Sequence, residues 1–241
     1  MRIVFEFKQS PYIHTEQVCV IGDFNFFEPT RGIMQKEDDI WKLEMNIPYG
    51  EHKYKFLLDG EIELNDPMAD DYVLDDLGNV WSSLVINAED EREYVDEIYS
   101  LHLEDYILTS RNLEETETMH INKRVFNLGV DKMASARLEF NHVIGVHEVE
   151  VLWYMPDGSL YSYGTETLSE QEELEESTYL WFYIPFADID KVQAEGIWKL
   201  KLIIDGNYIL EDSFNVQNGI SYGLYGNGLI RDKEVNISKW R

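Results

Sequence analysis

Histidines and clustered carboxylates are the side chains of this sequence best suited to catalysis or metal binding. The six histidines form neither a His-x-x-x-His nor a His-Glu-x-x-His pattern, the spacings that put metal ligands on one helix face. His142 and His147 flank a predicted turn, where facing strands could pair them, but no cysteine or acidic cluster joins them. We therefore predict no catalytic residue, no metal site and no cofactor.

A dense acidic segment lies between residues 66 and 76. Its carboxylates could offer oxygen ligands to calcium, but the Asp-x-Asp-x-Asp-Gly spacing of a calcium loop is missing. A glycosidase also needs paired acids, in a deep cleft on a larger scaffold than this chain offers. We interpret the segment as a solvated loop. Its aspartates are Asp66, Asp70, Asp71, Asp75 and Asp76.

The charge balance limits the classes of partner. The chain has 241 residues and a formal net charge of −27, from 47 acidic and 20 basic residues. Such a field repels nucleic-acid phosphates and anionic membrane surfaces, so we expect neither as a partner. The one cysteine, Cys19, cannot form an internal disulfide, and no apolar run has the length of a membrane span. No signal-peptide pattern opens the sequence, and we expect a cytoplasmic protein.

Short alternating stretches separated by turn residues dominate the first part of the chain. The stretches 18–21, 40–47, 51–58 and 80–86 each have the length of a strand, and Asp59-Gly60 after the third is a hairpin signal. This spacing predicts a first β-sandwich over 1–87.

The second part repeats the strand pattern after an acidic linker. Alternation over 146–154 and 198–204 predicts a second immunoglobulin-like sandwich over 98–216, and 217–241 forms a tail. The stretch 168–176 fits a charged crossing or a short surface helix. The predicted class is therefore all-β, with two antiparallel immunoglobulin-like β-sandwich domains joined by an acidic linker.

Four tryptophans lie within apolar strand patterns and are predicted to be core residues. They are Trp41, Trp153, Trp181 and Trp198. The stretch 179–185 (YLWFYIP), which contains Trp181, reads as a buried strand.

Several ordered motifs in residues 16–86 resemble one known family, the glycogen-binding module of AMP-activated protein kinase β subunits. This is a family-48 carbohydrate-binding module with an immunoglobulin-like fold. The matching stretches are, in order, 22–27 (GDFNFF), Trp41, 50–60 (GEHKYKFLLDG), 65–67 (NDP) and 77–79 (LGN). No family is recognised for the remainder.

The resemblance also implies a site. In the family two tryptophans cover the flat face of the sugar, while a lysine and a Leu-Gly-x-x-Asn loop hold its hydroxyls. The second tryptophan is Ile62 here, which cannot stack on a sugar, and Trp81 replaces the expected asparagine and could serve as a plate. The implied carbohydrate-binding residues are Phe27, Lys55, Leu77, Asn79 and Trp81.

Two functions follow from this sequence. The first is a non-catalytic protein that binds α-glucan, as a glycogen-like or starch-like polysaccharide or oligosaccharide, with the second domain presenting a protein partner. The second is a protein–protein interaction or scaffold module that kept the sandwich fold and lost sugar binding. An acidic surface would then suit a basic partner.

Overall fold

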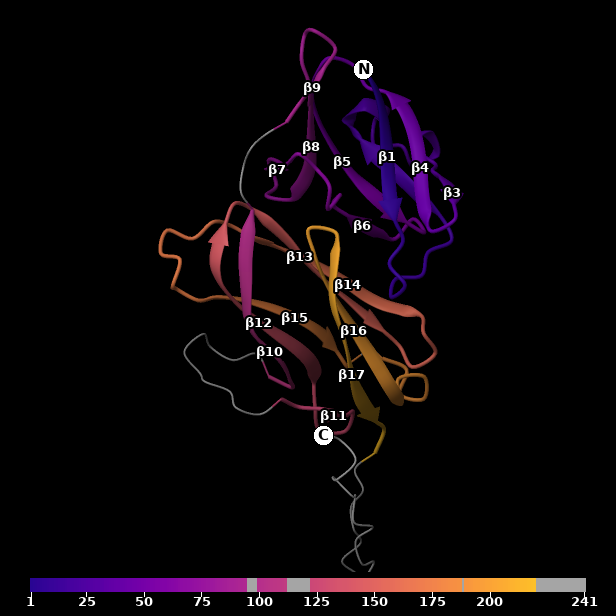
Figure 1. The fold of residues 1–241 in the computed structure, drawn as a ribbon. Helices are drawn as coiled ribbons and strands as arrows, with labels where there is room; N and C mark the ends of the chain where they lie inside the picture. The colour runs from indigo at the N-terminus through magenta and orange to yellow at the C-terminus, as the bar shows by residue number, and fades with distance from the viewer. Residues whose placement is uncertain (95–98, 112–121, 188, 220–241) are drawn as a thin grey trace, which may run out of the picture.

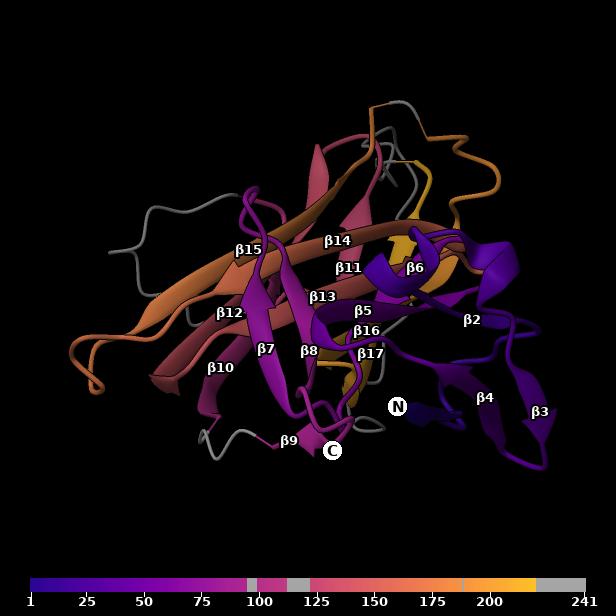
Figure 2. The same ribbon diagram turned by 90° about the horizontal axis from the view of Figure 1, so that it is seen from above.

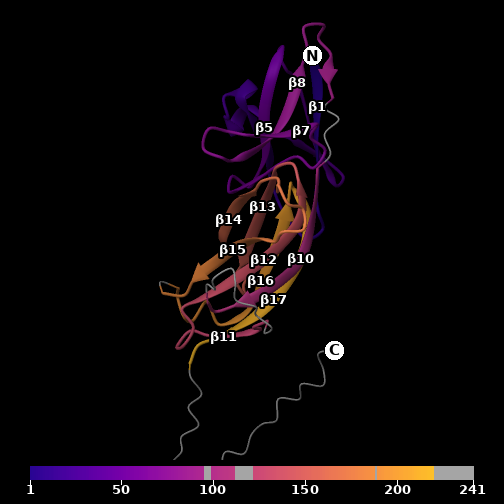
Figure 3. The ribbon, with the colours of Figure 1, turned by 90° about the vertical axis from the view of Figure 1, so that its left-hand side faces the viewer.

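The computed structural model describes residues 1–94, 99–111, 122–187 and 189–219, and the structural statements below concern these residues. They form two β-sandwiches stacked end to end, the N-terminal one above the C-terminal one in Figures 1 and 3. Apart from two single 3₁₀ turns, they contain no helix. No described helix thus has the length and apolar character needed to cross a bilayer.

The N-terminal sandwich consists of two antiparallel sheets. The first has the strand order β1 (Arg2–Lys8), β4 (Ile40–Asn46), β3 (Gln35–Glu37). The second has the order β2 (Val18–Gly22), β5 (Gly50–Leu58), β8 (Val80–Ile86), β7 (Asp71–Leu74), with β6 (Ile62–Leu64) on β5 and β9 (Arg92–Glu93) on β8.

Strict alternation builds the core of this sandwich. Along β1 every second side chain is buried, because successive residues of a strand point to opposite faces of the sheet. Phe5 packs edge-on against Tyr54 with ring centroids 5.0 Å apart, and Phe7 packs against Phe56 at 5.2 Å. These contacts hold the first sheet against β5 of the second sheet.

The C-terminal sandwich has a three-stranded and a five-stranded sheet. The smaller sheet has the order β10 (Ser100–Thr109), β12 (Met133–Ile144), β15 (Thr178–Pro185). The larger has the order β11 (Val125–Asn127), β17 (Asn207–Gln217), β16 (Gly196–Ile204), β13 (His147–Tyr154), β14 (Leu160–Leu168). Only β11 and β17 pair in parallel among these described strands.

The predicted all-β class of antiparallel sheets is confirmed by these strands. The segment 168–176 contains no helix beyond the end of β14; it forms bends and turns. The predicted linker contains β9, which extends the second N-terminal sheet to Glu93. The domain limits at 1–87 and 98–216 stay predictions, and the tail beyond Gly219 lies outside the described residues.

The core prediction for the tryptophans holds for three of the four. Trp41, Trp153 and Trp198 are buried. Trp181 is only partly buried, so its core assignment is wrong. The stretch 179–185 is not a buried strand throughout, because its alternate side chains point away from the core.

The two sandwiches share one pattern of hydrogen bonds at an Asp-Gly turn. Asp59 donates its backbone N–H to the carbonyl of Gln17, while its Oδ1 accepts the backbone N–H of Gln17 at 2.8 Å. Asp205 makes the same two contacts with the backbone of Glu148, at 3.0 and 2.8 Å. Each aspartate opens an Asp-Gly hairpin turn and fastens it to the start of the neighbouring strand. These paired hydrogen bonds therefore attach the β5–β6 hairpin to the start of β2. In the C-terminal sandwich they attach the β16–β17 hairpin to β13 in the same way.

The interface between the sandwiches is packed and hydrogen-bonded. Gly206 lies against the backbone of Asn65, so closely that an added Cβ would sit 1.9 Å from the Asn65 carbonyl oxygen. The hydroxyl of Tyr163 donates to the carbonyl of Glu63 at 2.7 Å, and Thr167 Oγ1 donates to the carbonyl of Gly78 at 2.8 Å. Seen from above, β14 passes behind the β7–β8 hairpin and crosses its direction (Figure 2).

Candidate functional site

The turn after β2 presents the first candidate ring, Phe27. Asn25 is buried at its centre, accepting the backbone N–H of Gly22 at 3.0 Å and donating to the carbonyl of Val20 at 2.8 Å. Phe26 and Phe27 both have positive φ, 62° and 55°, a conformation that most side chains avoid. The buried amide of Asn25 thus holds a strained turn whose end displays Phe27.

Phe27 and Trp81 lie in contact although they are far apart in the sequence. Their ring centroids are 5.3 Å apart and their planes meet at 67°, an edge-to-face arrangement. Phe27 is 40% exposed and Trp81, on β8, is partly exposed. The pair forms a bent apolar surface, not two coplanar plates.

The turn between β7 and β8 completes this surface through Asp75. One carboxylate oxygen of Asp75 accepts Trp81 Nε1 at 3.0 Å and Asn79 Nδ2 at 2.9 Å. The other accepts the backbone N–H groups of Leu77 and Asn79, both at 2.9 Å. These hydrogen bonds, those of Asn79 first, lower the pKa of Asp75. Leu77 is 87% exposed and Asn79 is exposed. The ionised Asp75 therefore fixes both residues beside Trp81.

Lys55 has a different place from the one that the resemblance implies. Its side chain is buried, and its Nζ donates to both oxygens of Glu148, on β13 of the C-terminal sandwich, at 2.6 and 2.8 Å. The Nζ also lies 5.3 Å from the centroid of the Trp81 ring. Lys55 thus connects Trp81 to the C-terminal sandwich and is not displayed at the surface.

A neighbouring lysine lies beside the same ring. Lys53 Nζ lies 5.7 Å from the centroid of Trp81, and its side chain is partly exposed. Lys53 and Lys55 share one face of β5 because they are two residues apart. That alternation is the signal by which Lys53 could have been found in the sequence. Ile62, which stands at the position of the second tryptophan, is buried in the N-terminal core.

A buried acidic group lies behind Lys55. Glu150 is fully buried, and neither of its carboxyl oxygens has a hydrogen-bond partner among the described residues. Burial and the charge of nearby Glu148 raise the pKa of Glu150 well above its ordinary value. Neither Glu148 nor Glu150 was predicted, since glutamates within an alternating strand are ordinarily solvated.

His147 contacts Asp205 at 2.6 Å, and this carboxylate raises the pKa of His147 despite the opposite effect of burial.

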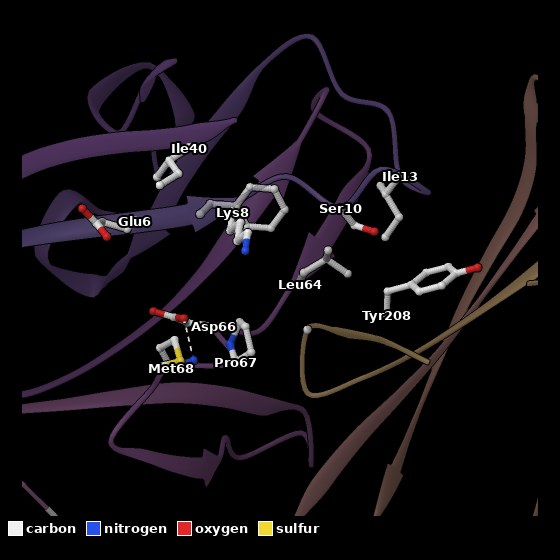
Figure 4. Close-up of a pocket in the computed structure, with 12 residues that line it drawn as sticks. Glu6, Lys8, Ser10, Ile13, Ile40, Leu64, Asp66, Pro67, Met68 and Tyr208 are labelled. Atoms are coloured by element: carbon white, nitrogen blue, oxygen red, sulfur yellow. Dashed lines mark hydrogen bonds between the residues drawn. The ribbon is translucent and has the colours of Figure 1, made fainter. Parts of the chain in front are cut away.

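A cleft of about 260 Å³ lies between β1, the turn that follows β6 and the β16–β17 hairpin (Figure 4). Ile13, Leu64 and Pro67 contribute apolar walls. Asp66, also in its lining, accepts the Tyr54 hydroxyl and the Met68 backbone N–H, both at 2.8 Å, and burial raises its pKa. Because both of its oxygens are engaged within the protein, we assign no chemistry to this cleft.

Two further acids of the 66–76 segment, Asp70 and Asp71, are also engaged. Asp70 forms an ion pair with Arg92 at 2.5 Å, and Asp71 accepts the hydroxyl of Tyr99. No group of three or more His, Cys, Asp or Glu side chains suited to a metal occurs in the described part of the chain.

One further motif was not predicted as a site. Residues 219–223 (GISYG) match the Gly-x-Ser-x-Gly pattern of a nucleophile elbow, which requires a strand-to-helix turn. All of this motif after Gly219 lies outside the described residues.

Residues 2–92 match one family, described as the glycogen recognition site of AMP-activated protein kinase. The match agrees with the resemblance seen in residues 16–86 and supports carbohydrate binding in general. Among curated protein sequences, no relative matches.

Solved structures with similar backbones are distant from this chain. The AlkC alkylpurine DNA glycosylase of Pseudomonas fluorescens, bound to DNA, is 9% identical over 48% of this chain and 30% of its own, with a TM-score of 0.33. A maltogenic amylase from S. marinus is 16% identical over 91% of this chain and 29% of its own, with a TM-score of 0.30. An immunoglobulin-like protein from Pseudomonas aeruginosa is 14% identical over 49% of this chain and 97% of its own, at 0.33. The chain thus spans less than a third of the first two, and scores this low support no functional argument.

Proposed function

We propose that the N-terminal sandwich, whose sequence matches a glycogen-recognition module, binds an α-glucan chain on the surface formed by Phe27, Leu77, Asn79 and Trp81. We call these four residues the glucan surface. The observation that carries the proposal is the contact between Phe27 and Trp81, whose ring centroids are 5.3 Å apart. The turn after β2 presents Phe27 and the start of β8 presents Trp81, and the buried amide of Asn25 and the ionised Asp75 hold these two segments in place.

The chemistry of this surface suits a neutral sugar. The faces and edges of Phe27 and Trp81 can cover the apolar face of a glucose ring, while the amide of Asn79 and the ammonium of Lys53 lie within reach of its hydroxyls. The net charge of −27 does not oppose an uncharged polymer. We further propose that the protein is non-catalytic and that it acts in the cytoplasm.

One observation favours the alternative of a scaffold that has lost sugar binding. Two positions that would contact sugar in the family point inward here: Lys55 binds Glu148, and Ile62 lies in the core. In that case the sandwich would serve to hold the C-terminal sandwich. Loss of two contacts lowers affinity without removing the Phe27–Trp81 surface, so we retain glucan binding as the proposal.

Affinity electrophoresis in gels that contain glycogen separates the two functions. We expect glycogen to retard the wild-type protein, and Phe27→Ala and Trp81→Ala each to weaken retardation at least tenfold, about 1.4 kcal/mol. Tyr49→Ala is the matched control, since Tyr49 is 72% exposed on the β4–β5 turn, outside the glucan surface. If the wild-type protein binds neither glycogen nor millimolar maltoheptaose, the proposal is refuted and the scaffold function remains.

A further inference from the structure

The outer face of the smaller C-terminal sheet carries a line of three aromatic side chains. Tyr179, Trp181 and Tyr183 alternate along β15, opposite Glu139, Arg137 and Ser135 of β12. Leu180 and Phe182, which alternate with them, pack in or against the buried core, as does the next residue of that face, Ile184, so the three rings point the other way. We call Tyr179, Trp181 and Tyr183 the aromatic row.

The aromatic row is accessible and linear. Tyr183 is 54% exposed, and Tyr179 and Trp181 are partly exposed. Residues two apart on a strand are separated by about 6.6 Å, so the rings are spaced regularly along one line. β15 is the outermost strand of its sheet order, which places the row at the sheet edge.

Polar groups accompany the rings. Tyr179 donates its hydroxyl to Glu139 Oε1 at 3.0 Å, and Ser177 Oγ donates to the same oxygen at 2.8 Å. Arg137, only 6% exposed, lies with its guanidinium carbon 5.2 Å from the centroid of Tyr179 and donates to Asp105 Oδ2 at 3.0 Å. Its Nε is buried without a hydrogen-bond partner among the described residues.

We propose that the aromatic row is a second carbohydrate-binding surface, on which a neutral glucan chain lies along β15. Flat rings in a line cover successive sugar faces, while tyrosine hydroxyls and Glu139 meet the hydroxyl edges. The positive charge of Arg137 is balanced by Asp105 and Glu139, so the surface offers an anionic ligand no free cation. The charge of −27 further excludes nucleic acid as the occupant.

A second surface has a measurable consequence that is separate from the glucan surface. Two sites on one protein that engage one polymer raise its apparent affinity by about 10²–10⁴ over a single site, whereas a short oligosaccharide gains nothing. The row should therefore contribute more to glycogen binding than to binding of one maltoheptaose molecule at the glucan surface.

The test uses Trp181→Ala and Tyr183→Ala in the full chain, with Tyr94→Ala as the control at an aromatic residue that is 76% exposed elsewhere. We expect both row variants to weaken retardation by glycogen at least tenfold, and Tyr183→Ala, at an exposed position, to keep the wild-type melting temperature. A variant that lacks Phe27 and Trp81 should retain weak glycogen binding, which Tyr183→Ala then removes.

Three results would overturn the inference: no binding of glycogen by the wild-type protein, unchanged retardation of both row variants, or a self-association in sedimentation that Tyr183→Ala abolishes. The proposed function can fail alone. If the variant without Phe27 and Trp81 binds glycogen as the wild type does, while Tyr183→Ala weakens binding, only the N-terminal proposal is lost.

Discussion

Lys55 and Glu148 form a buried ion pair across the boundary between the two sandwiches. The Lys55 Nζ donates to both carboxylate oxygens, and both side chains are only 4% exposed. Asn65 Nδ2 donates to the same carboxylate at 2.8 Å, so Glu148 receives donors from two segments of the N-terminal sandwich. Lys55, which the family resemblance assigns to sugar binding, thus binds the C-terminal sandwich. The Lys55–Glu148 pair is therefore a structural connection between the two sandwiches.

Replacing Lys55 with methionine should destabilise the protein strongly. The change would leave Glu148 buried beside Glu150 without its cation, and breaking a buried pair in this way costs about 3–5 kcal/mol. Urea unfolding at neutral pH measures the loss. Lys53→Met is the control, because Lys53 is partly exposed on the same face of the strand and should change stability by less than about 0.5 kcal/mol. Equal unfolding midpoints for the two variants would contradict the role given to Lys55.

Glu150 should make stability fall as the pH rises. Its pKa is raised in the folded protein, so between the unfolded and folded values the folded state holds a proton that the unfolded state has released. The stabilisation is complete below about pH 4.3 and declines above it, by at most about 1.4 kcal/mol per pH unit.

Glu150→Gln removes this titration while keeping the shape of the protonated carboxyl. The stability of Glu150→Gln relative to the wild type should therefore increase from pH 5 to pH 8, as measured by urea unfolding at each pH. Glu166→Gln, at an exposed position of β14, is the control and should track the wild type. A stability difference between Glu150→Gln and the wild type that does not change with pH would show that Glu150 titrates normally.

The contact of Gly206 with Asn65 can be separated from the backbone requirement of the turn. Gly206 and Gly60 occupy matching Asp-Gly turns with φ of 74° and 76°, but only at Gly206 would a new Cβ meet backbone, 1.9 Å from the Asn65 carbonyl oxygen. Gly60→Ala should cost about 1–2 kcal/mol for the left-handed conformation alone. Gly206→Ala should cost clearly more and hasten proteolysis between the sandwiches. Thermal unfolding and limited trypsin digestion compare the two; equal effects would mean that the hairpin docks loosely.

The buried side chain of Asn25 should maintain the turn conformation that displays Phe27. Asn25→Ala leaves the buried Gly22 N–H and Val20 carbonyl without their partner, at a cost of about 1–3 kcal/mol. We expect weaker glycogen retardation as well, since the strained Phe26–Phe27 turn loses its support. Asn87→Ala, which removes a partly exposed turn asparagine, is the control for the stability measurement. A destabilised Asn25→Ala variant that keeps wild-type glycogen affinity would show that Phe27 does not contact the sugar.

Local patterns in the sequence were sufficient for several strands, among them β2, β4, β5 and β8, and for the hairpin turn at Asp59-Gly60. The strand patterns and the Asp-Gly signals depend only on neighbouring residues, and the structure contains both. The motif resemblance also named Phe27 and Trp81, which lie in contact. It did not specify how the two rings are oriented, because the edge-to-face angle depends on packing between β8 and a distant turn.

The sequence alone therefore determined that this chain forms antiparallel β-sheets and which residues share a face of each strand. Only the tertiary structure decided what covers those faces. Lys55 is buried because the outer face of its sheet meets Glu148 of the other sandwich, and Trp181 is partly exposed because the outer face of β15 is not covered in the same way. Periodicity assigns a side chain to one of two faces, but burial depends on long-range docking, to which residues far along the chain contribute.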